Sequence, residues 1–135
     1  MRNYVLDSYA VLAYFQDEPG AEEVEKLLSE ATSGETALFL SAVNLGEMAY
    51  ITQRKAGTEK RDLLLAAIEA LPIQVVSADR TLALQAAEFK AGYPIAFADC
   101  FALALARTVG ATVVTGDPEF KKVEASVSIS WLPTD

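Results

Sequence analysis

The sequence predicts an α/β protein, a three-layer α/β/α sandwich in which helices cover both faces of a central, mainly parallel sheet. Short β-like runs alternate with longer helical ones along the chain, and this alternation implies parallel pairing of the strands. The composition, with 52% hydrophobic and 22% charged residues, is that of a globular protein. The length of 135 residues fits one compact domain with a proper core, so we expect a single domain over residues 1–135.

The first half of the chain is expected to hold two strands and three helices, in the order strand, helix, helix, strand, helix. Its opening run is short and apolar, as in a strand. In the second helix, apolar residues recur at helical spacing and acids occupy the opposite face. Ser41 is suited to cap the third helix. The predicted elements are Tyr4–Leu6, Tyr9–Phe15, Ala21–Ala31, Ala37–Leu40 and Ala42–Ala56.

The second half continues with a helix, a strand, two helices and two strands. Gly92 is suited to the C-cap of the second of these helices. The third is apolar all round, which predicts that it is buried. The predicted elements are Glu59–Ala70, Ile73–Val76, Arg80–Lys90, Asp99–Val109, Thr112–Thr115 and Val127–Trp131.

The charged and polar composition limits the chemistry. With 19 acidic and 11 basic residues the net charge is −8, which argues against broad, sequence-independent binding of nucleic acid. It leaves room for a nuclease, because an acidic metal site adds to the negative count. Histidine is absent, which removes imidazole metal ligands, a histidine general base and any Ser-His-Asp arrangement. Any reaction must therefore use carboxylates, hydroxyls, lysine or a bound ion.

The sequence also predicts where the protein is located. Cys100 is the single cysteine, which excludes an internal disulfide and fits a reducing compartment. No apolar run approaches the roughly 18 to 20 residues of a membrane span, and the N-terminus lacks a signal-peptide pattern. We therefore expect a soluble, cytoplasmic protein without a membrane partner.

Three of the acids stand out because they occur next to apolar segments, although each also has a structural explanation. Asp7 follows the first predicted strand and is suited to N-cap the next helix, as is Ser8. Asp117 precedes Pro118 and Glu119 in a typical helix start, with the proline at the first helical position and the acid in the first turn. Asp99 lies at the start of the apolar helix, either as its N-cap or as a buried carboxylate that needs a partner or a metal.

Glu47 is the fourth such acid, and capping does not explain it. It falls in the second turn of its predicted helix, too deep to cap. Val43 and Ile51 lie one turn away on either side, so the carboxyl points at least partly toward the core. The alternative is an ion pair with Arg54, seven residues further on the same face. We favour a functional role.

The four acids together suggest one site. In a parallel sheet, ligands gather beyond the carboxyl ends of the strands, where Asp7 and Asp117 are expected. Four carboxylates in one pocket repel one another unless a cation compensates. Mg²⁺ and Mn²⁺ bind through a few carboxylates, keep several waters and accept substrate phosphates. The chemistry that fits such a site is phosphodiester hydrolysis, which needs no histidine.

At these residues the chain resembles the PIN-domain ribonucleases, over essentially its whole length. The resemblance is carried by a strand ending in Asp7, "LSAVNLGEMAY" with Glu47, "IAFADCFALALA" with Asp99 and "VVTGDPEF" with Asp117. Within the family the chain looks most like the small VapC toxins of toxin–antitoxin pairs. The resemblance implies an Mg²⁺- or Mn²⁺-dependent endoribonuclease, a homodimer, and a small antitoxin protein that lays a segment across the site.

Carried over residue by residue, the resemblance assigns the four acids as the metal-binding and catalytic quartet. Asp7 and Asp99 are the first choice of direct ligands, and the other two act directly or through water. Thr115 matches a hydroxyl that often accompanies the last acid of the family. Ser8 and Ser41 are expected either to support the site or to cap helices. The quartet is Asp7, Glu47, Asp99 and Asp117.

One position departs from the family pattern. The residue before the last acid is often basic or polar in the family, and here it is Gly116. Phosphate contacts must then come from elsewhere. The densest basic stretch is a candidate contact for the RNA backbone or the antitoxin, although its members also suit the solvated ends of helices. It consists of Arg54, Lys55, Lys60 and Arg61.

Two other enzyme classes that use an acid after the first strand fit the sequence less well. Phosphatases that form an aspartyl-phosphate carry the motif D-x-D-x-T at the first strand, and in this chain Tyr9 occupies the position of the second acid. A receiver domain would need two adjacent acids after the first strand, and "VLDSY" has one. A housekeeping RNA-processing nuclease and a non-catalytic PIN interaction module remain alternatives, although loss of catalysis should appear as a missing acid.

Overall fold

The computed structural model describes residues 1–135 and is built on a five-stranded sheet. The strand order is β3-β2-β1-β4-β5, and every neighbouring pair is parallel. This confirms the predicted parallel sheet, with strand ends that shift by a few residues. The strands are β1 (Arg2–Leu6), β2 (Thr36–Ser41), β3 (Gln74–Val76), β4 (Thr112–Thr115) and β5 (Ile129–Trp131).

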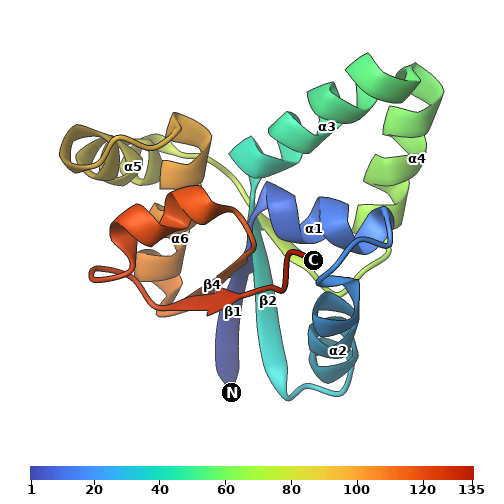
Figure 1. Ribbon diagram of the computed structural model, residues 1–135, viewed down its shortest axis with the longest axis horizontal. Helices are drawn as coiled ribbons and strands as arrows, with labels where there is room; N and C mark the ends of the chain where they lie inside the picture. The colour runs from blue at the N-terminus through green and yellow to red at the C-terminus, as the bar shows by residue number, and fades with distance from the viewer.

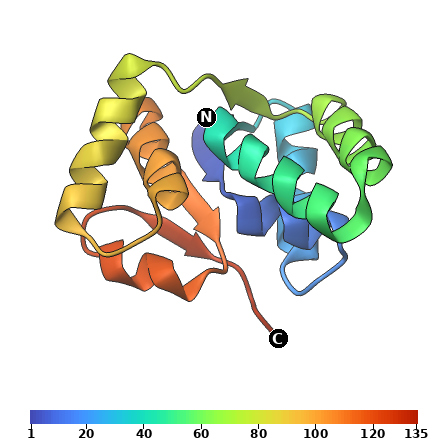
Figure 2. The same ribbon diagram turned by 90° about the horizontal axis from the view of Figure 1, so that it is seen from above.

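Helices cover both faces of this sheet, so the predicted three-layer α/β/α sandwich is confirmed (Figure 1). Helices α5 and α6 lie on one side, and α1 to α4 lie on the other. Figure 2 shows the same two groups from above, joined by the segment that contains β3. The helices are α1 (Ser8–Phe15), α2 (Ala21–Thr32), α3 (Ala42–Ala56), α4 (Thr58–Glu69), α5 (Arg80–Gly92), α6 (Phe97–Val109) and the 3₁₀ helix η1 (Pro118–Val123).

Two hydrophobic cores fill the spaces between the layers, and the alternation of side chains along the strands divides them. Val5 and Val113 face the core under α5 and α6, whereas Leu6 and Val114 face the core under α1 to α4. Successive strand residues point to opposite faces, so neighbours in sequence enter different cores. α6 contributes seven consecutive buried residues, which confirms that this apolar helix is buried.

Two predicted helix ends are wrong by two residues, and the other predicted helix ends agree with the structure within one residue. α6 begins at Phe97, two residues before Asp99, with Ala96 as its N-cap. α5 includes Gly92 and is capped by Tyr93, whose N–H donates to the carbonyl of Phe89. Tyr93 is extended because a residue that precedes proline is biased away from the helical region, and Pro94 follows it. The proline, rather than the glycine, therefore ends α5.

The sheet order creates a switch point between β1 and β4. From β1 the chain moves outward through β2 to β3, then returns to add β4 on the other side of β1. Ligand sites in open α/β sheets form beyond the carboxyl ends of strands at such a point. Asp7 follows β1 and Asp117 comes two residues after β4, so both acids flank it.

No single helix is long and apolar enough to cross a membrane, and α5 and α6 reach that length only as a pair bent by 117°.

Candidate functional site

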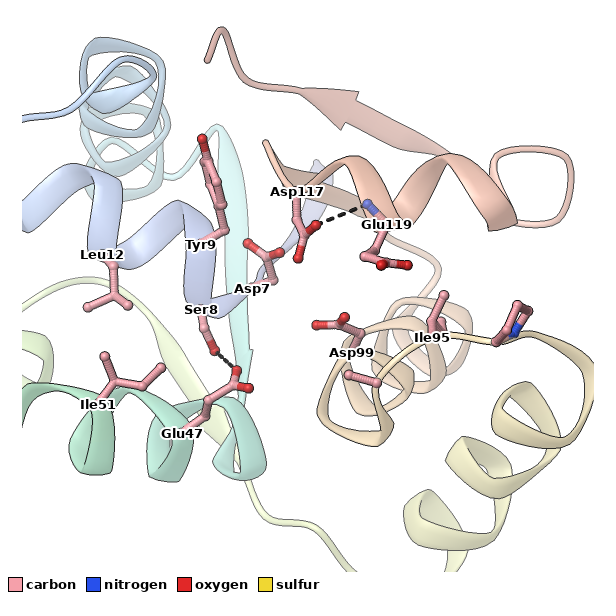
Figure 3. Close-up of a pocket in the computed structure, with 12 residues that line it drawn as sticks. Asp7, Ser8, Tyr9, Leu12, Glu47, Ile51, Ile95, Asp99, Asp117 and Glu119 are labelled. Carbon is pink, nitrogen blue, oxygen red and sulfur yellow. Dashed lines mark hydrogen bonds between the residues drawn. The ribbon is translucent and has the colours of Figure 1, made fainter. Parts of the chain in front are cut away.

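An acidic pocket of about 380 Å³ opens at the switch point (Figure 3). Five carboxyl side chains line it, and none of its lining residues is a lysine or arginine. The acids come from the ends of β1 and β4, from α3, from α6 and from η1, so the fold brings together residues more than 100 positions apart. The five acids are Asp7, Glu47, Asp99, Asp117 and Glu119.

Asp7 is the most buried of these acids, with 2% of its surface exposed. Its Oδ1 accepts a hydrogen bond of 2.8 Å from the amide of Ala10, which confirms that it caps α1. Its Oδ2 accepts a hydrogen bond of 2.5 Å from the hydroxyl of Thr115. Each carboxylate oxygen has two lone pairs, so both oxygens keep acceptor capacity. Capping and a place in the pocket therefore coexist in one side chain.

Thr115 joins the ends of the two central strands. Its buried hydroxyl donates to Asp7 across the β1–β4 switch point and accepts 3.0 Å from the amide of Asp117. Asp117 in turn caps η1 through the amide of Glu119, at 3.0 Å, as the sequence predicted. The Thr115 hydroxyl therefore orients both the carboxyl group of Asp7 and the backbone that carries Asp117.

Glu47 points into the pocket from the second turn of α3, and Ser8 holds it there. The Ser8 hydroxyl lies 2.5 Å from the carboxyl oxygen Oε1 of Glu47 and 3.3 Å from the carbonyl of Asn44. The alternative ion pair with Arg54 is absent, and the Arg54 guanidinium instead lies 5.0 Å from the ring centre of Tyr50. Ser8 does not cap α1, since Asp7 takes that role.

Asp99 lies in the first turn of α6 and faces Asp7 and Asp117 across the pocket (Figure 3). Its N-cap alternative is wrong, because Ala96 is the N-cap and no side chain bonds to the helix end. Asn44 links the two helices, since its Nδ2 donates 3.2 Å to the carbonyl of Ala98. Asn44 is fully buried and its Oδ1 has no partner.

Burial and repulsion from neighbouring acids disfavour the charged forms of Asp7 and Asp99. Burial raises the pKa of Asp7 to about 7, opposed by its hydrogen bonds to Thr115 and Ala10 and reinforced by the charges of Asp99 and Asp117. Burial also raises the pKa of Asp99 to about 7, and the charges of Asp117, Glu47 and Glu119 add to the effect. A cation in the pocket would favour the ionised forms.

The carboxyl groups of the pocket are the kind of ligand that a hard divalent cation prefers, but they do not form a complete coordination shell. Mg²⁺ and Mn²⁺ prefer carboxylate oxygens, which this pocket supplies, and the only pocket acid paired with a basic group is Glu119, whose carboxyl lies 2.6 Å from Lys122. No three acids are grouped closely enough to form a complete ligand set. Mg²⁺ commonly uses one or two carboxylates and keeps several waters, so it does not require such a set.

Several predicted residues lie outside the pocket. Ser41 caps α3 by accepting 3.1 Å from the amide of Val43 and does not line it. The predicted basic contacts lie at the end of α3 and the start of α4, at the upper right of Figure 1. None of them lines the pocket. Arg61 bonds to Gln53 and Asp62 instead. These basic residues are Arg54, Lys55, Lys60 and Arg61.

Three residues of the site region escaped the sequence analysis. Glu119 was read only as part of a helix start, although its position two residues after Asp117 also directs it toward the same edge. Asn44 lies three residues before Glu47, on the same helix face. Tyr9 lines the pocket from the first turn of α1. A single asparagine and a tyrosine two residues after an acid carry no distinctive sequence signal.

Comparison with known proteins identifies relatives of the fold. The family model for the PIN domain matches residues 4–126. No curated protein matches the chain in sequence. Among solved structures, VapBC2 from Rickettsia felis, bound to a DNA fragment from its promoter, superposes with a TM-score of 0.74 at 16% identity, covering 97% of this chain and 99% of that one.

Two further structures are similar over nearly their whole length. VapC20 from Mycobacterium tuberculosis, described as a toxin that cleaves the Sarcin-Ricin loop, has a TM-score of 0.73 and 19% identity, covering 96% of this chain and 99% of that one. DNA-bound VapBC from Salmonella typhimurium has a TM-score of 0.74 and 18% identity, covering 96% and 98%. At these identities the likeness is one of fold.

Proposed function

This chain belongs to the PIN domain family, and from that premise we propose that it is a metal-dependent endoribonuclease, the toxin of a toxin–antitoxin pair. The observation that carries the proposal is the acidic pocket. Carboxyl groups from separate elements meet there at a topological switch point, and no lysine or arginine lines it. Such a cluster is costly for a stable fold unless a cation and a substrate use it.

We assign the metal site to the four acids predicted from sequence. Asp7 and Asp99 are the direct ligands, and Glu47 and Asp117 act directly or through water. A bound Mg²⁺ or Mn²⁺ would lower the pKa of a water molecule and screen charge on the phosphate. Thr115 orients the carboxyl of Asp7, as its hydrogen bond supports.

The neighbouring residues have supporting roles in this proposal. Ser8 holds the carboxyl of Glu47 in the pocket. Ser41 fixes the start of the helix that carries Glu47, because it caps α3. The basic corner of α3 and α4 remains the proposed contact for the RNA backbone or the antitoxin; it comprises Arg54, Lys55, Lys60 and Arg61.

The toxin assignment is supported by the VapC and VapBC structures that share the fold. We propose that the protein acts in the cytoplasm as a homodimer, and that a cognate small antitoxin protein inhibits it by covering the acidic pocket. Expression without the antitoxin should then arrest growth, and Glu47→Gln should relieve the arrest. Harmless expression of an active nuclease would instead favour a housekeeping RNA-processing enzyme.

The biochemical test uses the purified protein and a structured RNA. With Mg²⁺ or Mn²⁺ present we expect cleavage within the chain, EDTA should abolish it, and renewed metal should restore it. Full activity in EDTA would refute the metal dependence. No cleavage of any RNA under metal-replete conditions would favour the non-catalytic PIN module.

A further inference from the structure

A second groove, of about 420 Å³, opens beside the acidic pocket. We call it the Tyr9–Trp131 groove, after two aromatic residues that line it together with Gly116, Lys121 and Thr134. Tyr9 also lines the acidic pocket, so one side chain forms a wall of both. Figure 3 shows its ring beside the segment that carries Asp117. The two cavities are therefore neighbours that share the side chain of Tyr9.

Gly116 makes room for that ring. A Cβ atom at this position would lie 2.4 Å from Cε1 and 2.8 Å from Cζ of Tyr9, closer than non-bonded carbons approach. Gly116 does not adopt a positive φ, so its backbone would accept alanine. The departure from the family pattern at position 116 thus has a structural counterpart, because the ring of Tyr9 occupies the space where a side chain would begin.

Lys121 supplies a cation that the acidic pocket lacks. It takes part in none of the ion pairs and donates no side-chain hydrogen bond. Its neighbour Lys122 is already engaged, 2.6 Å from Glu119 and 3.1 Å from the carbonyl of Pro94. Among the larger cavities, only the Tyr9–Trp131 groove shares a lining residue with the acidic pocket and contains such an uncompensated lysine.

Trp131 supplies a second aromatic surface. It is half-buried, and its Nε1 donates 2.9 Å to Glu124, which holds the indole in place. Tyr9 is also half-buried. Aromatic faces for base stacking and a cation for the backbone are the combination by which proteins hold single-stranded nucleic acid. An unpaired lysine next to an acidic pocket also matches a substrate whose phosphates extend beyond the site.

We propose that the Tyr9–Trp131 groove binds the nucleotide next to the scissile phosphate of a single-stranded RNA segment. Its base stacks on Tyr9 or Trp131, and Lys121 contacts its phosphate. This inference rests on the proposed ribonuclease function and names the part of the substrate that lies outside the metal site. Tyr9 and Lys121 are substrate-positioning residues in it.

Trp131 is the only tryptophan in the chain, so its fluorescence reports directly on the groove. We would titrate the cleavage-impaired Asp99→Asn variant with a short single-stranded RNA of randomised sequence in Mg²⁺. A saturable quench of the tryptophan emission is expected. Tyr9→Leu should weaken binding about tenfold, within the range for loss of one stacked base, and Tyr9→Phe should retain it.

Two more variants separate stacking and charge from general damage. Gly116→Ala should weaken RNA binding as Tyr9→Leu does, because the new methyl group displaces the ring. Lys121→Ala should lower the slope of log K against log salt by about 0.7, the contribution of one phosphate contact on a single strand. Lys26→Ala is the matched control, since Lys26 is an exposed lysine of α2 that also forms no ion pair.

The outcomes distinguish this inference from the function on which it rests. If the wild-type protein cleaves no RNA, the ribonuclease proposal fails. If it cleaves RNA but Tyr9→Leu and Lys121→Ala keep its KM and salt dependence, the groove proposal is overturned while the nuclease stands. If purified antitoxin quenches the tryptophan emission and RNA does not, the groove proposal is also overturned, in favour of a protein-binding surface.

Discussion

At the scale of single residues, Asp7 shows how one carboxyl serves both fold and site. Its Oδ1 stabilises the first turn of α1, and its Oδ2 is held by Thr115 at the end of β4. These bonds fix the carboxyl at the switch point before any ligand arrives. A local reading of the sequence finds only the cap, because the partner hydroxyl is 108 positions away.

We predict that Thr115→Val impairs the site while preserving the shape of the core. The change leaves Oδ2 of buried Asp7 without its partner, a loss of about 1–3 kcal/mol in the free energy of unfolding. RNA cleavage should fall, because Asp7 is no longer oriented. Denaturant unfolding and cleavage assays measure the two effects, and Thr115→Ser should restore both. Wild-type values in Thr115→Val would mean that the hydroxyl has no such role.

The raised pKa values predict how stability depends on pH in the metal-free protein. Asp7 and Asp99 have pKa values of about 7 in the folded chain, against an ordinary value of 3.8. Between these values the folded state holds protons that the unfolded state has lost, so stability falls as pH rises from about 4 to about 7. Unfolding in EDTA should therefore require less denaturant at pH 8 than at pH 5.

Metal should reverse this trend, because the ionised acids bind it. Added Mg²⁺ is expected to raise Tm more at pH 8 than at pH 5. Asp7→Asn should reduce the pH dependence in EDTA and leave the part that is due to Asp99, since the new amide does not titrate. A metal-free protein that becomes more stable between pH 5 and pH 8 would contradict the placement of these acids.

At the scale of elements, the site depends on how α3 and α6 meet. Glu47 and Asp99 lie on these two helices, and Asn44 ties them together through the carbonyl of Ala98. The backbone carbonyl of Asn44 also accepts from Ser8, the residue that holds Glu47. The side-chain amide of buried Asn44 therefore helps to set the distance between Glu47 and Asp99.

We predict that Asn44→Ala loosens this junction. It removes the donor to Ala98 and opens space in a buried region, so the free energy of unfolding should fall by about 1–3 kcal/mol. Cleavage should fall more than stability alone requires, because Glu47 and Asp99 lose their mutual position. Thermal unfolding and the cleavage rate at a temperature where the variant is folded test this. A stable variant with full activity would show that other contacts set the spacing.

The limits of sequence reasoning also lie at this scale. The alternation of elements predicted the sandwich, and periodicity predicted α3 with its correct bounds, because both signals are local. The start of α6 was misplaced, since Ala96 caps without a side chain. Glu47 was found because capping could not explain it. Glu119 was hidden by a good helix start, and Tyr9 and Gly116 reveal their contact only when β4 and α1 are adjacent.

At the scale of the whole molecule, the topology explains why the acids converge. An all-parallel sheet aligns every carboxyl end at one edge, and the switch between β1 and β4 opens the pocket there. The negative charge of the pocket suits this arrangement only if a bound cation balances it and also attracts the substrate phosphates. The Tyr9–Trp131 groove shares Tyr9 with the pocket and has Lys121 as the one charged residue of its lining.

The central claim is that the acidic pocket is a metal-dependent ribonuclease site, and a comparison of two aspartates tests it most directly. Asp79 caps α5 by accepting 2.8 Å from the amide of Leu82 and does not line the pocket, so Asp79→Asn matches the chemical change of Asp99→Asn. We predict that Asp99→Asn reduces RNA cleavage in Mg²⁺ by about a hundredfold or more, the scale at which preorganised electrostatic groups contribute. Asp79→Asn should cleave at the wild-type rate. Equal cleavage by the two variants would contradict the account.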